Sequence, residues 1–67
     1  MSPKRLATVI RKHREAKGMT QEEVAQKAGV TKQYVTMLEA GTRASPSLPV
    51  LQRIAKALGV TMADLLK

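Results

Sequence analysis

A chain of 67 residues allows one domain with a small core, and the absence of cysteine excludes disulfide bridges and thiolate metal sites. Phe and Trp are also absent and there is a single Tyr, so the core has to be aliphatic. Lysine and arginine number 12 against 5 aspartates and glutamates, which sets the formal net charge at +7. This excess favours an anionic partner, either a nucleic acid or an acidic membrane surface.

The basic charge is concentrated near the start of the chain. Residues 1–18 carry six basic side chains and one acidic one, whereas residues 19–41 carry two basic and three acidic ones. No apolar stretch is long enough to cross a bilayer, and the first residues lack the apolar segment and cleavage site of a signal peptide. The basic first segment offers a membrane surface only a narrow apolar stripe and no aromatic anchor. We therefore expect a soluble, cytoplasmic protein with no membrane partner.

Residues 2–18 predict the first helix. Ser2 is the expected N-cap, Pro3 suits the first helical position, and Gly18 lies beyond the end. Helical spacing places the buried stripe of this segment at Leu6, Val9 and Ile10, with His13 next on the same face. We expect His13 to be a partly buried packing residue.

Two short helices follow with almost nothing between them. Thr20 is the expected cap of the first, and Glu23 completes a capping box three residues later. Thr31 caps the second, and Gly29 and Gly41 stand where the two helices end. The side chains expected to point inward are Val24, Ala25, Ala28, Val35 and Leu38.

The remaining residues predict a loop and two more helices. The loop is GTRASP, after which Ser47 caps a helix that tolerates Pro49 in its first turn and ends at Gly59. Thr61 and Asp64 form a capping box for a short last helix, MADLL. The inward side chains of the fourth helix are Leu51, Ile54, Ala55 and Leu58. Nothing alternates with a period of two, so we expect an all-α fold of five helices without strands.

The stretch AGVT, residues 28–31, joins the two short helices. A turn of a few residues that contains glycine, placed between two helices, is the sequence form of the helix-turn-helix. In that motif the first helix crosses the phosphate backbone of DNA and the second lies in the major groove. For the function, it therefore matters whether the segment 31–41 reads DNA.

About residues 5–66, nearly the whole chain, closely resemble the Cro and phage-repressor type of helix-turn-helix, often called the xenobiotic-response-element family. The most specific pieces are TQEEVAQKAGVT, the LEAG that closes the third helix, and LQRIAKALGV. The resemblance implies one compact five-helix DNA-binding domain over residues 1–67, with the helix-turn-helix at about 20–40, that usually binds operator DNA as a dimer. Because the chain ends at Lys67, we expect no separate effector or cleavage domain. Tyr34 and Met37 on the base-facing surface leave the target sequence open.

Four side chains of the third helix are the candidate base readers. Lys32 stands where the helix dipole disfavours a cation, which invites a functional explanation, and it can reach guanine O6 and N7. Gln33 suits a bidentate contact with adenine, and Thr36 and Met37 suit thymine methyl groups or the sugar edge. The alternatives are a lysine merely tolerated at the surface and a methionine that fills the core.

Phosphate contacts are expected from the residues around this helix. The start of the second helix forms an anion site, and the resemblance places a phosphate contact at Gln21. Tyr34 either donates its hydroxyl to a phosphate or shields the helix surface. Arg43 in the loop is well placed for the backbone of DNA, as is Arg11 in the basic first segment. Lys4 and Arg5 of the same segment are placed equally well, and the alternative is that all three only add to the positive field of this segment.

Arg14 and Glu39 are expected to form a structural pair. Glu39 lies in the last turn of its helix, where a negative charge opposes the dipole and needs a cation. The resemblance implies that an arginine and a glutamate at these positions join the first and third helices. The alternative is two separately solvated charges.

A dimer contact is expected at the end of the chain. The last helix is barely two turns long yet carries Met62, Leu65 and Leu66, and the fourth helix has a further apolar line that includes Val50. One small domain can hardly cover all of these side chains, so we expect some of them to form a two-fold contact. The alternative is that Leu65 and Leu66 fold back onto their own core.

Catalytic chemistry is not expected. The residues show no nucleophile with a base, no phosphate-cradling glycine loop and no metal-ligand spacing, so we assign no enzyme activity, metal or cofactor. The sequence predicts a transcriptional regulator that binds a pseudo-palindromic DNA operator as a homodimer. The alternative is a protein-interaction module, such as an antitoxin or bridging factor. The operator, the regulated gene, and contacts with RNA polymerase or a toxin stay open.

Overall fold

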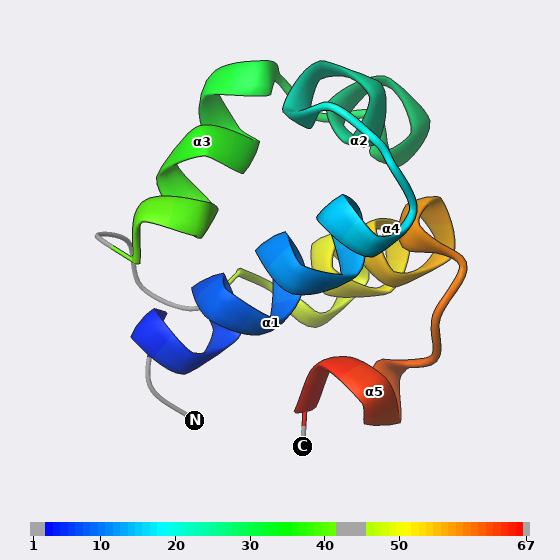
Figure 1. The fold of residues 1–67 in the computed structure, drawn as a ribbon. Coiled ribbons are helices and arrows are strands. Elements are labelled where there is room, and N and C mark those ends of the chain that lie inside the picture. Colours follow the sequence, from blue (N-terminus) through cyan, green and yellow to red (C-terminus); the bar gives the residue numbers. More distant parts are fainter. Residues whose placement is uncertain (1–2, 42–45, 67) are drawn as a thin grey trace.

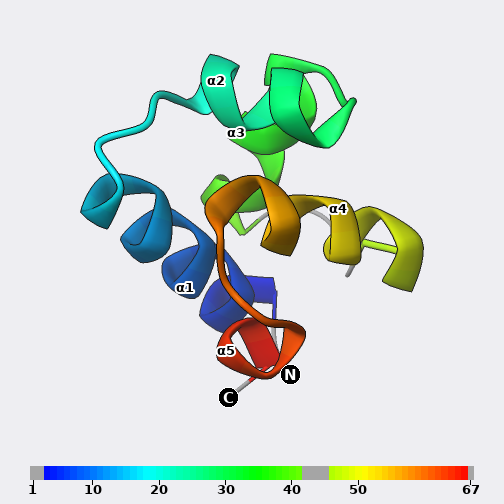
Figure 2. The same cartoon turned by 90° about the vertical axis from the view of Figure 1, so that its right-hand side faces the viewer.

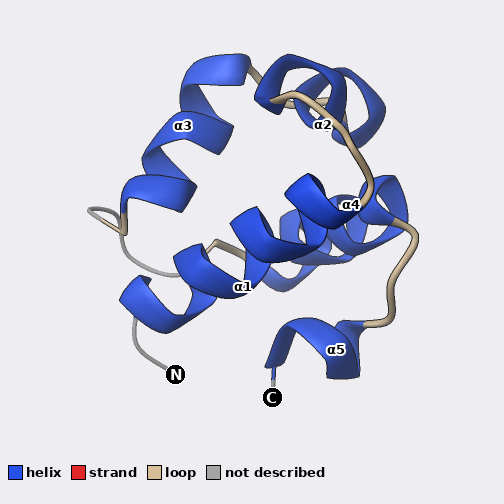
Figure 3. Ribbon diagram, viewed as in Figure 1, coloured by secondary structure: helices blue, strands red, loops and turns tan. Residues whose placement is uncertain are grey.

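The computed structural model describes residues 3–41 and 46–66, and all of its regular structure is helical over these ranges (Figure 3). The helices are α1 (Pro3–Ala16), α2 (Gln21–Ala28), α3 (Lys32–Ala40), α4 (Leu48–Leu58) and α5 (Met62–Leu66). The all-α fold of five helices is thus confirmed. The expected cap at Ser2 and most of the GTRASP loop lie outside the described residues.

The helix starts are made by the expected side chains. Thr20 accepts a hydrogen bond from the Glu23 amide, and Glu23 accepts one from the Thr20 amide, which completes the capping box of α2. Thr31 and Ser47 likewise cap α3 and α4. Asp64 and Thr61 bond reciprocally at the start of α5. Because such caps satisfy amide groups that have no partner within the helix, they fix where each helix begins.

The tight turn after α2 depends on Gly29. This residue has a φ of 72°, in the left-handed region that is costly for residues with a Cβ atom. The amide of Val30 then bonds back to the carbonyl of Ala25, which closes the helix end. The chain can therefore start α3 with only three residues between it and the end of α2.

The five helices surround one common core (Figures 1 and 2). Helix α3 packs against α1 and α2, α2 also packs against α4, and α5 packs against α1 and α4. In both views α5 lies at the opposite end of the molecule from α2 and α3. The last helix is therefore far from the helix-turn-helix.

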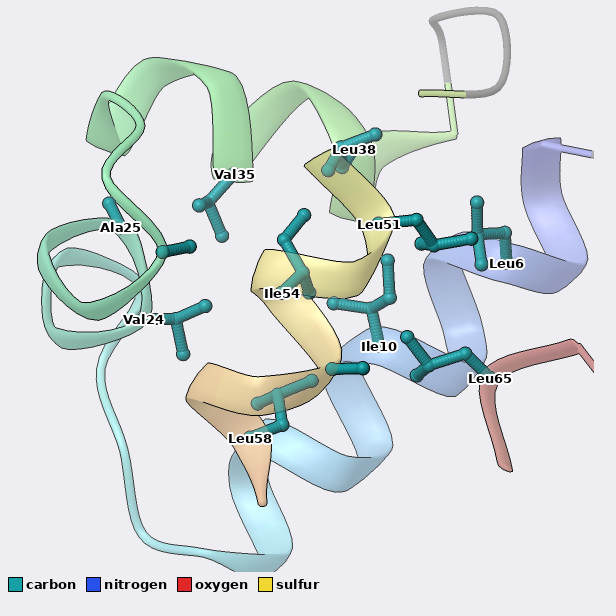
Figure 4. Close-up of a cluster of buried hydrophobic side chains, with 12 residues drawn as sticks. Leu6, Ile10, Val24, Ala25, Val35, Leu38, Leu51, Ile54, Leu58 and Leu65 are labelled. Atoms are coloured by element: carbon teal, nitrogen blue, oxygen red, sulfur yellow. The ribbon is translucent and has the colours of Figure 1, made fainter. Parts of the chain in front are cut away.

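The core is aliphatic, as the composition requires (Figure 4). Its fully buried large side chains are Ile10, Ile54, Leu58, Leu65, Val24 and Val35. They come from all five helices, so every helix contributes to one cluster. All inward side chains expected for the second, third and fourth helices are buried.

The burial of Leu65 corrects the expectation that this residue forms a dimer contact. Its side chain is 0% exposed within a single subunit, so it is not available to a second copy. Leu66, one residue later, is 49% exposed. The helix turns by about 100° per residue, so two adjacent leucines cannot share one face. The alternative reading, that the residue folds back onto its own core, is the right one for Leu65 alone.

Candidate nucleic-acid interface

Helix α3 has a buried side and an exposed side. Val35 and Leu38 are buried on the inner side. Lys32, Gln33 and Thr36 are exposed on the outer side. Since they are spaced at one, three and four residues, these three side chains form one polar surface on the first two turns of the helix. Of the four candidate base readers, these three are accessible.

Met37 and Tyr34 lie at the edges of this surface. Both side chains are half-buried. Tyr34 packs against the hydrophobic core with part of its ring, which agrees with a shielding role and leaves its hydroxyl contact with phosphate untested. Met37 is accessible enough to touch a ligand but less open than its polar neighbours.

An ion pair fixes the inner side of α3 to α1. Arg14 Nε donates to Glu39 Oε2 at 2.7 Å, and Arg14 Nη2 donates to Glu39 Oε1 at 2.9 Å. The side chains are 14% and 4% exposed, so the pair is nearly removed from water. Arg14 Nη1 also donates to the carbonyl of Met19, which ties the pair to the turn before α2. The expected ion pair between the first and third helices is present, and its geometry is bidentate.

Hydrogen bonding to Glu39 raises the pKa of Arg14 above its usual value. The guanidinium therefore stays charged beside Glu39. Among the described residues, no buried side-chain nitrogen or oxygen lacks a hydrogen-bond partner. The pair thus behaves as a permanent structural link between α1 and α3.

Gln21 connects this ion pair to the exposed side of α3. Its Nε2 donates to Glu39 Oε1 at 3.2 Å, and its Oε1 accepts from Thr36 Oγ1 at 2.8 Å. Sequence reasoning assigned Gln21 only to phosphate and did not find this connection. No local pattern signals it, because Gln21 lies on α2 whereas Thr36 and Glu39 lie on α3, and the two helices meet only in the folded chain.

A hollow of about 510 Å³ opens beside this network. It lies where the α1–α2 turn, the first turn of α2 and the start of α3 converge. Its lining residues are Arg14, Gly18, Met19, Thr20, Gln21, Glu22 and Lys32. Lys32 and the first turn of α2 therefore share one concave surface, although they are eleven residues apart in the chain.

The other candidate residues are more scattered. Arg11 is exposed on α1, and Arg43 lies outside the described residues. Val50 and Met62 are half-buried and pack against the core, so each keeps only part of its surface for a partner. Leu48, which was not among the expected contact residues, is the most exposed large apolar side chain described, at 64%.

The described residues show no cluster of three potential metal ligands. None of the described helices has the length and apolar character needed to cross a membrane.

Helices α2 and α3 are joined by a tight turn, and α3 has a buried inner side and an exposed polar outer side. This arrangement defines a helix-turn-helix protein. A family model described as helix-turn-helix matches residues 10–65. The chain belongs to this family, of the Cro and phage-repressor type, whose members are DNA-binding transcription regulators.

Known proteins of this family are similar along most of the chain. An uncharacterised transcriptional regulator of Methanothermobacter thermautotrophicus is 54% identical over 54 residues, which cover 81% of this chain and 77% of that protein. The regulator SinR of Bacillus subtilis is 35% identical over 57 residues, which cover 85% of this chain and 51% of SinR. The chain therefore spans only about half the length of SinR.

Solved structures agree with the fold. The restriction-modification controller protein C.AhdI of Aeromonas hydrophila superposes with a TM-score of 0.89 at 32% identity, over 94% of both chains. SinR in complex with DNA superposes with a TM-score of 0.87 at 32% identity, over 92% of this chain and 98% of that one.

Proposed function

We propose that this protein is a sequence-specific regulator of transcription that binds double-stranded DNA in the cytoplasm, with α3 in the major groove. The observation that carries the proposal is the division of α3 into two sides. The inner side is fixed by core residues and by Glu39, whereas the outer side presents polar groups that have no role in the core. A helix held in this way can meet base edges without rearrangement of its scaffold.

Lys32 and Gln33 are the proposed hydrogen-bonding readers. They open α3, and in a helix-turn-helix the N-terminal residues of the second helix are the ones that contact base edges. Lysine pairs well with guanine O6 and N7, and glutamine pairs with adenine N6 and N7. Met37, at the edge of the surface, would add an apolar contact.

Contacts to phosphate would position the domain on the duplex. The hollow beside Lys32 includes the first turn of α2, where backbone amides and the helix dipole favour an anion. One hydrogen of the Gln21 amide is not used by the bond to Glu39, so Gln21 keeps a donor for phosphate. Arg11, Arg43 and Tyr34 are the further proposed contacts. The formal charge of +7 supports binding to a polyanion.

The base-reading role is tested with Gln33→Ala. The site is first selected from a pool of random duplexes, and affinity is then measured on this site and on a scrambled duplex. We expect Gln33→Ala to weaken the selected site by about 1–3 kcal/mol and the scrambled duplex hardly at all. Gln52→Ala, which removes an exposed glutamine from α4, is the matched control and should change neither. Equal losses on both duplexes would show that Gln33 does not read sequence.

Salt dependence separates this function from a protein-interaction module. A protein that neutralises several phosphates loses affinity with a slope of about −0.9 per phosphate in a plot of log K against log salt. We expect a steep slope for the wild-type chain and a slope flatter by about one unit for Arg43→Ala. A flat slope with weak binding to every duplex would favour the module that binds another protein.

We also propose that the regulator acts as a homodimer on a pseudo-palindromic operator. Leu66 is half-exposed on α5, and Met62 and Val50 leave part of their apolar surface open. Because α5 lies at the opposite end from α2 and α3, a two-fold contact through α5 leaves both helix-turn-helix motifs free. Two copies of α3 about 34 Å apart would then meet successive major grooves on one side of the duplex.

The dimer is tested with Leu66→Glu and with Gln52→Glu as a control of equal charge on exposed α4 surface. We expect Leu66→Glu to remain folded, to sediment at half the wild-type mass, and to lose affinity for the full operator far more than for a half-site. Gln52→Glu should behave as wild type in both assays. A wild-type chain that stays monomeric at high concentration and binds DNA as one copy would refute the homodimer.

A further inference from the structure

The single proton of the Thr36 hydroxyl group is committed within the protein. Thr36 Oγ1 lies 2.8 Å from Gln21 Oε1 and 3.0 Å from the carbonyl oxygen of Lys32. Both neighbours are acceptors, and a hydroxyl has a single proton. Thr36 therefore has no hydrogen to donate to a base or a phosphate, although its side chain is exposed.

The orientation of the Gln21 amide follows from the ion pair behind it. Its nitrogen donates to Glu39 Oε1, so its oxygen has to face the other way, toward Thr36. A flipped amide would place its oxygen against a carboxylate that is already held by Arg14. The acceptor offered to Thr36 is thus fixed by charges in the interior of the protein.

Gln21 also selects the rotamer of Thr36. A threonine in a helix has two rotamers that let its hydroxyl bond to the preceding turn. The rotamer seen here also brings Oγ1 within hydrogen-bond distance of Gln21, and this second bond favours it. With Oγ1 held against Gln21 and the preceding turn, the side chain has no free donor, and its methyl group is the apolar part that remains for a ligand.

We propose that Thr36 recognises thymine through its methyl group, and that Gln21 is the positioning residue that keeps this methyl group in place. The proposal rests on the proposed function and deepens it, because it names one base and one kind of contact. Thr36 lies one turn beyond Lys32 and Gln33 on the outer side of α3, within the surface proposed to enter the groove. The C5 methyl of thymine is the apolar group that the major groove exposes, and a threonine methyl is a suitable partner.

The test removes one methyl group from each side of the contact. On the DNA side, each thymine of the selected operator is replaced in turn by deoxyuridine, which lacks only the C5 methyl. We expect one thymine in each half-site to be sensitive, with a loss of about fourfold, the value of one buried methyl group. The other thymines serve as controls and should change affinity little.

On the protein side, Thr36→Ser removes the methyl group and keeps the hydroxyl. We expect this variant to bind the normal operator about fourfold more weakly than wild type and to be indifferent to deoxyuridine at the sensitive position. Thr36→Val keeps the methyl group and loses the hydroxyl, so it should still prefer thymine. A preference that disappears in Thr36→Val but survives in Thr36→Ser would overturn the proposal, since the hydroxyl would then be the reading group.

Gln21→Ala tests the positioning role separately. With two rotamers open to Thr36, we expect the preference for thymine over deoxyuridine to fall to about twofold. Loss of a phosphate contact at Gln21 would weaken both duplexes equally and leave this ratio unchanged, so an unchanged ratio overturns the positioning role. A chain that binds no duplex refutes the proposed function and this contact with it. A chain that selects an operator but ignores every deoxyuridine refutes the contact alone.

Discussion

Removing Arg14 should destabilise the fold much more than neutralising Glu39. Replacing both residues with apolar side chains should recover part of the lost stability. In Arg14→Met the Glu39 carboxylate, 4% exposed, keeps only the hydrogen bond from Gln21. In Glu39→Gln the Arg14 guanidinium, 14% exposed, keeps its bond to the carbonyl of Met19 and some access to water. Arg14→Met therefore leaves a buried carboxylate without its cation, whereas Glu39→Gln leaves a less buried guanidinium without its anion.

The magnitudes follow from burial. Leaving one charge of a buried pair without its partner costs about 3–5 kcal/mol, and we expect Arg14→Met to fall in this range. Glu39→Gln should cost about 2 kcal/mol, because its amide can still accept one bond and Arg14 is less buried. A domain of this size has only about 3–5 kcal/mol of stability, so Arg14→Met should be largely unfolded. The double variant Arg14→Met/Glu39→Met buries no charge and should be more stable than Arg14→Met alone.

Urea denaturation followed by far-ultraviolet circular dichroism measures all three variants. Glu15→Gln, an exposed carboxylate on α1, is the control and should shift stability by less than about 0.5 kcal/mol. In a thermal melt followed by the same signal, the melting temperature of Glu39→Gln should fall by roughly 8–16 °C, given 4–8 °C per kcal/mol in a domain of this size. If the two single changes cost equally little, and the double change costs their sum, the pair does not hold α1 and α3 together.

Two further predictions concern helix ends. Gly29→Ala should cost about 1 kcal/mol in the same denaturation assay, because alanine is strained in the left-handed conformation of Gly29. Gly41→Ala should cost more, because its added Cβ would also lie 3.3 Å from the Cα atom of Lys4, whereas Gly29 faces open space. Equal losses would show that the close approach of α1 to Gly41 does not matter. The hydrogen bond from the Thr20 amide lowers the pKa of Glu23 below its ordinary value. The stability from this carboxylate is therefore present at pH values above the ordinary pKa and is lost as pH falls through the lower folded-state pKa. Denaturation across acidic pH should show a smaller loss for Glu23→Gln than for wild type, and parallel curves would contradict this.

The helices and their ends were predictable because their signals are local. Thr20, Thr31 and Ser47 cap the segments that follow them, and Gly29 and Gly59 end helices, all within a few residues of the groups they satisfy. The spacing of apolar residues then identifies the buried sides of α2, α3 and α4. Pairing of Arg14 with Glu39 came from family resemblance, since the residues are 25 positions apart.

The remaining features depend on how helices cross. The bond between Gln21 and Thr36 requires a particular angle between α2 and α3, which no sequence spacing specifies. Leu65 and Leu66 could not be separated because α5 has only five residues, too few for a periodic pattern. The exposure of Leu48, one residue after its cap, likewise follows from the placement of α4 rather than from its composition.

The aliphatic core has a practical consequence for spectroscopy. Tyr34 is the single aromatic residue of the chain, and it lies on α3 with its ring partly against the core and partly in solvent. Tyrosine emission therefore comes from one position, at the border between the scaffold and the proposed DNA surface. Its intensity would report the packing of α3 during unfolding, and its quenching would report the approach of a ligand, both without an added label.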